Sequence, residues 1–305
     1  MSDAIPAPPE KTEPGNSVHS KLFNDVREAI ISLPAYFRTE TFISGVAATD
    51  IHTLNTVLGA TIEDQVVQTL NSMRLVWDPN EEYALYSFVR QSQTFPDVRL
   101  QKAGESPDVL MGIELKGWYL LAKEGEPSFR YQVTPAACNP QDLIVVVPWV
   151  LSQVISGKPQ AFTPYIESAR YAAEYRNYHW QFIRNSRSDK GISAPESVKP
   201  YPHKADEIAD RPASDQGGNF GRFARTGIMD TYLGEMRKLQ LCGVRIEYWL
   251  SFLRAFQDQK SEDAVRSALE RLAGQVSDDD TETPPSHASV LAIVDELRRL
   301  AGLDG

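Results

Sequence analysis

The chain has 305 residues, of which 42% are hydrophobic and 24% charged, and its formal net charge is −10. These values are typical of a soluble globular protein with enough apolar content for one large domain or two ordinary ones. No run of the sequence approaches the roughly eighteen uncharged apolar residues of a membrane span, and the N-terminus lacks the basic-then-apolar pattern of a secretion signal, so we expect a cytoplasmic protein without a membrane partner.

The first part of the chain predicts a tail followed by two helices. Residues 1–20 are rich in proline, glutamate and serine, which indicates a disordered N-terminal tail. Apolar residues then recur at helical spacing over residues 22–33, and Pro34 should end this helix. A second helix is predicted over residues 61–76, where a capping-box sequence starting at Thr61 precedes an apolar stripe of Ile62, Val66, Leu70 and Met73.

The middle of the chain predicts strands. Residues 83–89 are strand-like, residues 95–121 indicate two strands around the turn AGESP, and a further strand is expected over SFRYQVT at 128–134. The run LIVVVPWV at 143–150 is apolar at nearly every position, so both of its faces should be covered. We therefore expect an α/β (α+β) protein, with a mixed central β-sheet flanked by helices.

The remainder predicts one helix, a long loop and additional C-terminal helices. A helix with several aromatic residues and arginines is expected over residues 164–183. Residues 186–220 lack periodicity, and so long a loop is usually functional or disordered. Helices should resume near Ile228 and include residues 244–256 and 262–273. The acidic residues 276–287 indicate a linker, and 288–305 an amphipathic end helix.

Two carboxylates of the predicted hairpin should meet. A tight turn at Glu105–Ser106 places Asp97 opposite Glu114, with Cβ atoms about 4.5–5.5 Å apart. Asp108, in the second Pro-Asp pair, lies six residues before Glu114, or roughly 20 Å along a strand. Asp97 and not Asp108 should therefore share an ion with Glu114.

Lys116 completes this candidate site, because residues two apart in a strand point to the same side. Two carboxylates suit a hard divalent ion such as Mg²⁺, with Mn²⁺ as a possible substitute. Such an ion polarises a phosphodiester and lowers the pKa of a bound water. Lys116 could position or deprotonate that water and offset negative charge in the transition state. The trio thus indicates phosphodiester hydrolysis, with Asp97 and Glu114 as metal ligands.

The order Pro96-Asp97, then Glu114-Leu115-Lys116, resembles the signature of the PD-(D/E)XK nucleases, and most of all type II restriction endonucleases. The resemblance implies a nuclease domain over residues 21–275 with a PD-(D/E)XK nuclease core at about 61–183. It also implies an accessory catalytic acid at Glu63. By this resemblance the protein would be a Mg²⁺-dependent, site-specific endonuclease that cuts double-stranded DNA as a homodimer.

Basic residues after the core are the candidates for DNA contact. The net charge opposes a DNA-binding role, but a run of acidic residues lies in the predicted linker, whereas arginines cluster in the middle of the chain. The part that contacts DNA is expected over about 184–275, where glycines permit close approach and arginines suit bidentate contacts. The candidate DNA-binding residues are Arg184, Arg187, Lys190, Arg222 and Arg225.

Each of these residues also has a structural interpretation. Glu114 and Lys116 could be an ion pair on an exposed strand, and Glu63 could stabilise the first turn of a helix. Arginines at 170, 176 and 184 are usually a solvated helix face. The aromatic residues at 171, 175, 178, 180 and 182 are by default core.

Two other functions from the same residues remain open. One is a less specific repair or phage-type PD-(D/E)XK nuclease, and the other is a non-catalytic DNA-binding protein that has the hairpin only as structure. Zinc chemistry is disfavoured, because the two cysteines and five histidines have no metal-binding spacing.

Overall fold

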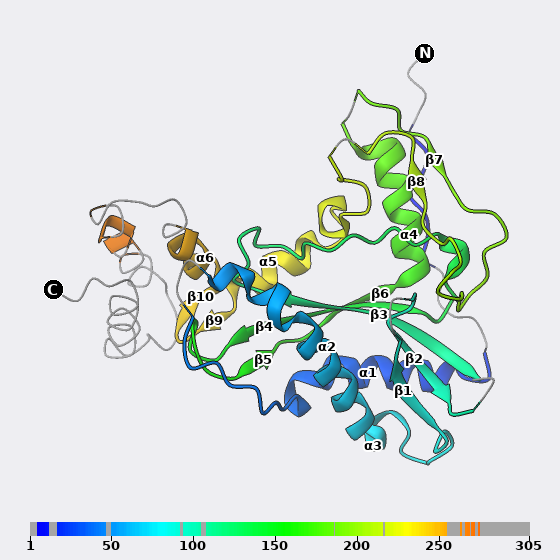
Figure 1. Cartoon of the computed structure of the whole chain (residues 1–305), viewed down its shortest axis with the longest axis horizontal. Coiled ribbons are helices and arrows are strands. Elements are labelled where there is room, and N and C mark those ends of the chain that lie inside the picture. Colours follow the sequence, from blue (N-terminus) through cyan, green and yellow to red (C-terminus); the bar gives the residue numbers. More distant parts are fainter. Residues whose placement is uncertain are drawn as a thin grey trace.

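The computed structural model (Figure 1) describes most of the chain. The described residues are 5–11, 17–46, 50–91, 94–104, 108–185, 187–215 and 217–254, with isolated helical residues between 263 and 274. The predicted linker at 276–287 and the end helix at 288–305 lie outside them, as does most of the helix predicted at 262–273.

A mixed sheet forms the centre of the described structure (Figure 1). Its strands follow the order β1-β2-β3-β4-β5, and β6 pairs with β4 along the same edge as β5. Only β3 and β4 run parallel; the other pairs are antiparallel. The strands are β1 Tyr86–Arg90, β2 Val98–Lys102, β3 Val109–Tyr119, β4 Leu143–Leu151, β5 Pro159–Ala161 and β6 Tyr165–Ser168.

Helices cover both sides of this sheet. Figure 1 shows α1 and α3 below β3 and β4, and α4 and α5 above them, while α2 packs against β1 and β3. All nine residues of β4 are buried, so the prediction that both of its faces are covered is confirmed, as is the mixed central sheet flanked by helices. The helices are α1 Ser20–Tyr36, α2 Leu54–Ser72, α3 Arg74–Trp77, α4 Ala169–Tyr178, α5 Asp230–Lys238 and α6 Ile246–Arg254.

Short elements connect these layers. A π-helical turn, His179–Ile183, continues α4, and two small ribbons lie in the later loops. The long segment predicted at 186–220 is indeed mostly irregular. The ribbons pair β7 Ile192–Ser193 with β8 Arg211–Pro212 and β9 Gln240–Leu241 with β10 Val244–Arg245, and 3₁₀ turns occupy Ile51–Thr53, Pro135–Ala137 and Phe223–Thr226.

Two predicted helix limits are wrong. Helix α1 runs past Pro34 to Tyr36, because a proline in the last turn removes only one backbone hydrogen bond. Helix α2 starts at Leu54 and not at Thr61, so the expected capping box does not exist. Its apolar face begins a full two turns earlier, with buried Leu54 and Leu58.

Two strand predictions also need correction. Residues 128–134 make only isolated bridges, because the Arg176 guanidinium takes the carbonyl groups of Tyr131 and Val133, at 2.8 and 3.0 Å. The segment predicted as a helix from residue 164 begins instead with strand β6, which fills the open edge of buried β4. The helix then starts at Ala169, capped by the Ser168 hydroxyl.

Part of the N-terminal segment contacts helix α4. Residues 5–11 lie along α4, where the Tyr178 hydroxyl donates to the Pro6 carbonyl at 3.0 Å and Lys11 forms an ion pair with Glu167. Lys11 also lies 5.2 Å from the centre of the Tyr171 ring. These contacts place residues 5–11 against the folded domain, and the disorder expected over residues 1–20 stays a prediction.

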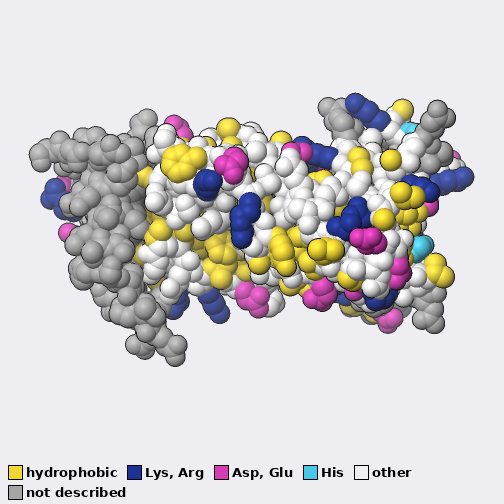
Figure 2. Space-filling model, turned by 90° about the horizontal axis from the view of Figure 1, so that it is seen from below, with side chains coloured by type: hydrophobic (Ala, Val, Ile, Leu, Met, Phe, Trp, Pro, Cys, Tyr) yellow, Lys and Arg dark blue, Asp and Glu magenta, His cyan; other side chains and the backbone are white. Residues whose placement is uncertain are grey.

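The surface carries apolar side chains in a visible band. Figure 2 shows hydrophobic groups along the middle of the face seen from below. Exposed hydrophobic residues of α1 are Ile31 and Tyr36. Among the helices that the structure describes, none is long and apolar enough to cross a membrane.

Candidate active site on the β2–β3 hairpin

The register of the hairpin agrees with the prediction. Val98 pairs with Ile113, and Arg99 pairs with Gly112, so Asp97 comes directly before β2 at the level of Glu114. A bulge after Leu100 shifts the register only toward the turn, away from Asp97. The turn at 105–107 lies outside the described residues.

Gly112 allows the chain before β2 to approach β3 closely. A Cβ atom at Gly112 would stand 2.3 Å from Cγ of Pro96 and 3.1 Å from Oδ1 of Asp142. The Gly112 amide donates to that same Asp142 oxygen at 2.7 Å. The missing side chain therefore lets Pro96 pass over the strand and brings Asp97 to its place.

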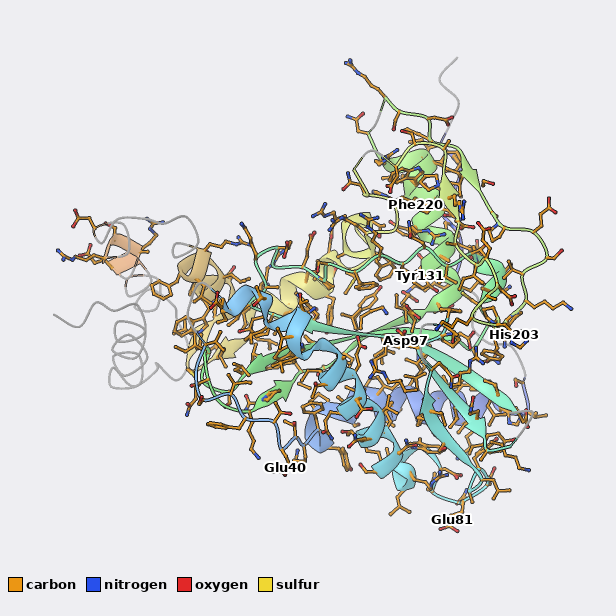
Figure 3. All side chains as sticks on the ribbon, viewed as in Figure 1. Glu40, Glu81, Asp97, Tyr131, His203 and Phe220 are labelled. Carbon is orange, nitrogen blue, oxygen red and sulfur yellow. The ribbon has the colours of Figure 1, made fainter. Side chains whose placement is uncertain are left out.

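Three charged side chains meet there. Nζ of Lys116 lies 2.8 Å from Oδ2 of Asp97 and 3.1 Å from Oε1 of Glu114. The exposed fractions of the side chains are 23% for Lys116, 27% for Asp97 and 11% for Glu114, so solvent reaches the group that we call the Lys116 cluster. Figure 3 shows Asp97 where the strands converge, below Tyr131. The predicted geometry is confirmed; the catalytic roles remain predictions.

The cluster has more negative than positive charge. Burial raises the pKa of Glu114 to about 7, and repulsion from Asp97 adds to this while Lys116 opposes it. Burial alone would lower the pKa of Lys116, but attraction to Glu114 and Asp97 outweighs it and raises that pKa above its usual value. Lys116 is therefore a cation at neutral pH, suited to stabilise negative charge rather than to accept a proton from water.

Beyond Glu114, strand β3 extends past β2, and within the described residues no strand pairs with its outer edge. Side chains take the place of the missing strand. The backbone amides of Leu115, Gly117 and Tyr119 donate, in that order, to Asp97 at 3.2 Å, Glu63 at 3.4 Å and Asn55 at 3.0 Å. Two of these acceptors come from α2, which therefore protects the edge of the sheet.

Glu63 lies in the middle of α2 and not in a first turn, so the helix-dipole interpretation is wrong. Besides the Gly117 amide, it contacts Arg90, whose Nη2 is 3.2 Å from its Oε2. Burial raises the pKa of Glu63, while the charge of Lys116 lowers it and that of Asp97 raises it. Glu63 thus feels the charges of the Lys116 cluster and also holds the strand edge.

Asp108 has a separate role at the other end of the hairpin. Its Oδ2 accepts a hydrogen bond from the Tyr86 hydroxyl at 2.6 Å. The prediction that Asp97, and not Asp108, accompanies Glu114 is confirmed.

The donor set can be tested against a divalent ion. The Lys116 ammonium lies within hydrogen-bonding distance of oxygens from both Asp97 and Glu114, so one position exists that both carboxylates reach. No group of three or more His, Cys, Asp or Glu side chains in the described part of the chain is arranged to hold a metal ion. Two carboxylates fit Mg²⁺, which keeps several waters and takes further oxygens from a phosphate. The ammonium would have to move from the shared position.

Several residues that build the site were not predicted. Asn55 and Arg90 contact the strand edge and Glu63, Gly112 admits Pro96, and Asp142 holds the amides of Gly112 and Asn139. A glycine inside a strand is a signal for close backbone approach and could have been used. The partners of Asn55 and Arg90 are too distant in sequence to be read from any local pattern.

The candidate DNA-binding residues are only partly gathered. Arg184, Arg222 and Arg225 line one cavity of about 490 Å³. Lys190 donates to the Arg184 carbonyl at 2.8 Å, and Arg187 is exposed outside the cavity lining. Of the aromatic residues expected in the core, Trp180 is buried; Phe182 is exposed, and the tyrosines at 171, 175 and 178 are half-buried.

Comparisons with protein families, with curated proteins and with solved structures found no match to this chain.

Proposed function

We propose that the protein is a Mg²⁺-dependent endonuclease that hydrolyses phosphodiester bonds of double-stranded DNA at a specific sequence. The observation that supports this most is the Lys116 cluster, in which Asp97, Glu114 and Lys116 share one point. The order of elements also agrees with the PD-(D/E)XK core, since α2, the β2–β3 hairpin, β4 and α4 follow one another. By the same resemblance the enzyme would act as a homodimer, with one site for each DNA strand.

Each residue then has a distinct task. Asp97 and Glu114 would hold Mg²⁺, or Mn²⁺ in its place, which polarises the phosphate and lowers the pKa of a bound water. Lys116, charged at neutral pH, would stabilise the negative charge that develops on the phosphate oxygens. Glu63 would stay beside the strand, where its carboxylate orients the Gly117 amide.

The experiment that tests the proposal uses the two Pro-Asp pairs as a matched set. A long duplex is incubated with protein and Mg²⁺, and the products are separated by size. Asp97→Asn and Glu114→Gln should lower the cleavage rate by at least about 10²-fold, because each removes a metal ligand. Asp108→Asn is the control and should retain cleavage, because Asp108 lies apart from the cluster.

The products distinguish the proposal from the other two functions. Discrete bands support a site-specific enzyme, and a smear indicates a less specific nuclease. If the DNA stays intact with Mg²⁺ and with Mn²⁺, the non-catalytic alternative is favoured, in which the Lys116 cluster is a structural ion pair of a DNA-binding protein. Lys116→Ala sharpens the test: it should abolish cleavage and spare DNA binding, because the lysine stabilises the transition state more than the ground state.

A further inference from the structure

A cavity of about 490 Å³ lies where α4 ends and the turn at 219–226 passes. We call it the arginine cavity. Its described lining has no Asp or Glu side chain. The polar and aromatic residues that matter are Arg176, His179, Trp180, Arg184, Arg222 and Arg225.

Two of these arginines have no carboxylate bound to them in the described part of the chain. Arg176 is paired with Asp210, and Arg225 with Glu126 at 2.7 Å. Arg184 and Arg222 form no such pair. Instead, the Arg184 guanidinium lies 3.2 Å from the centre of the Trp180 ring. The cavity therefore keeps positive charge that its own walls do not neutralise.

The walls also contain hydrogen-bond donors without acceptors. Within the described residues, Nε1 of Trp180, Nε of Arg184 and Nε of Arg222 are buried and have no hydrogen-bond partner. Trp180 itself is only 3% exposed. These three atoms are themselves buried, so a ligand would contact the half-buried side chains of Arg184 and Arg222 that line the cavity, and guanidinium groups favour a ligand rich in acceptor oxygens.

Carboxylates near the cavity do not supply these acceptors. Asp215 is close enough to raise the pKa of Arg184 against the larger, opposite effect of burial. Its own oxygens accept from the Phe220 amide at 2.7 Å and lie 3.9 Å from Arg130. The positive wall therefore remains open to an anion from outside.

We propose that the arginine cavity binds the phosphate group of a nucleotide, which belongs either to bound DNA or to a free mononucleotide. Arginine guanidinium groups match phosphate oxygens, and the partly exposed side chain of Ile183 offers an apolar contact for a base or sugar. The volume is that of a small-ligand site and larger than phosphate alone requires. The DNA source rests on the proposed function; the phosphate site itself does not.

The test measures thermal unfolding of the full chain in EDTA, at constant ionic strength set with chloride. The probes are inorganic phosphate, thymidine 5′-monophosphate, thymidine and a short DNA duplex. The monophosphate or the duplex should raise the midpoint by roughly 5 °C at a hundredfold excess over Kd, and thymidine should not. Stabilisation by the monophosphate identifies a free-nucleotide source, and stabilisation by the duplex alone identifies DNA.

Three variants tie the effect to the cavity. Arg184→Gln combined with Arg222→Gln should weaken binding at least about tenfold. Ile183→Glu, at a residue 46% exposed, places a carboxylate in the lining with little risk to folding and should weaken binding similarly. The control Arg211→Gln removes one positive charge from an exposed pair with Glu207, which is the same net change as in Ile183→Glu, and should leave binding unchanged.

Three results would overturn the inference: no stabilisation by any phosphate-bearing probe, equal stabilisation by thymidine, or equal loss in Arg211→Gln. Because EDTA prevents metal-dependent cleavage, the outcome does not depend on the proposed enzyme activity. If Glu114→Gln abolishes cleavage and retains nucleotide binding, the two sites are independent. If cleavage is absent in all proteins and the phosphate probes still bind, only the nuclease proposal fails.

Discussion

Two ion-pair groups of this protein differ in the balance of their positive and negative charges and in their access to solvent. The Arg176–Asp210 pair is wholly buried, with side-chain exposures of 1% and 0%. Its charges are equal, and Arg176 also holds two backbone carbonyls. The Lys116 cluster sets two carboxylates against one ammonium and remains partly open to solvent.

This difference separates a structural ion pair from a candidate reactive group. The balanced, enclosed pair uses the guanidinium donors of Arg176 within the protein, and it fixes the segment 130–133 on α4. An unbalanced group that solvent reaches can gain a cation. The variants below test this distinction, from the largest expected effect to the smallest.

Arg176→Met should cause the largest loss of stability. The change leaves the Asp210 carboxylate buried without a cation and releases the carbonyls of Tyr131 and Val133. We expect the free energy of unfolding to fall by about 3–5 kcal/mol, measured by urea denaturation. The exposed pair Arg211–Glu207 is the control: Glu207→Ala should cost about 0–1 kcal/mol. Equal effects would show that the buried pair is not structural.

Glu114→Gln should change how stability depends on pH. The folded protein binds a proton at Glu114 with a pKa of about 7, above the ordinary 4.5. This proton stabilises the folded state fully below pH 4.5, and the contribution is lost as pH rises toward 7. The variant lacks this loss, so at pH 8 its free energy of unfolding should exceed that of the wild type by up to about 3 kcal/mol.

Urea denaturation of both proteins at pH 5, where most of the contribution is still present, and at pH 8, where it is lost, measures this difference. Asp142, whose pKa burial raises to about 6, contributes the same slope in both proteins. Mg²⁺ at pH 8 should stabilise the wild type and not the variant, because metal competes with the proton for the carboxylates. If the free energy of unfolding depends on pH in the same way in both proteins, Glu114 does not have the raised pKa on which this prediction rests.

Gly112→Ala should disturb the cluster without removing any of its charges. The new methyl group would collide with Pro96, so Asp97 must shift or the fold must lose about 1–3 kcal/mol. We expect both lower stability and weaker Mg²⁺ binding, measured by denaturation with and without the ion. Gly234→Ala, in α5, is the matched control: no neighbour lies within 4 Å, and the change should stabilise by about 0.5–1 kcal/mol.

Glu63→Gln should have the smallest effect on stability. A glutamine can still accept from the Gly117 amide, and only the partly exposed ion pair with Arg90 is lost, which costs about 0–1 kcal/mol. The cleavage rate decides the role of Glu63. An unchanged rate means that it only protects the strand edge, and a fall of tenfold or more means that its charge assists Asp97 and Glu114.

The sequence predicted the geometry of the Lys116 cluster because local rules determine it. Parity along β3 placed Glu114 and Lys116 on one face, and the short turn placed Asp97 opposite Glu114. The apolar run of β4 likewise predicted a strand that is covered on both faces. These patterns need only residues close to one another in the chain.

The failures concern long-range partners. The segment 128–134 has the composition of a strand, but Arg176, more than forty residues later, takes two of its carbonyls. Strand β6 was read as a helix because nothing local shows that β4 has an open edge there. Likewise, the position of Glu63 on β3 depends on how α2 packs, which its own sequence does not specify.

The outer edge of β3, beyond its pairing with β2, also bears on how the protein avoids pairing with strands of other molecules. Strand edges with free amides can pair with strands of other molecules. Here Asn55 and Glu63 from α2 occupy two of the amides, and Asp97 a third. A folding intermediate with the sheet formed and α2 detached would expose this row beside the apolar side chains of β3. Free amides in such a row could pair with strands of other molecules, so the docking of α2 shields this edge as well as supporting the finished sheet.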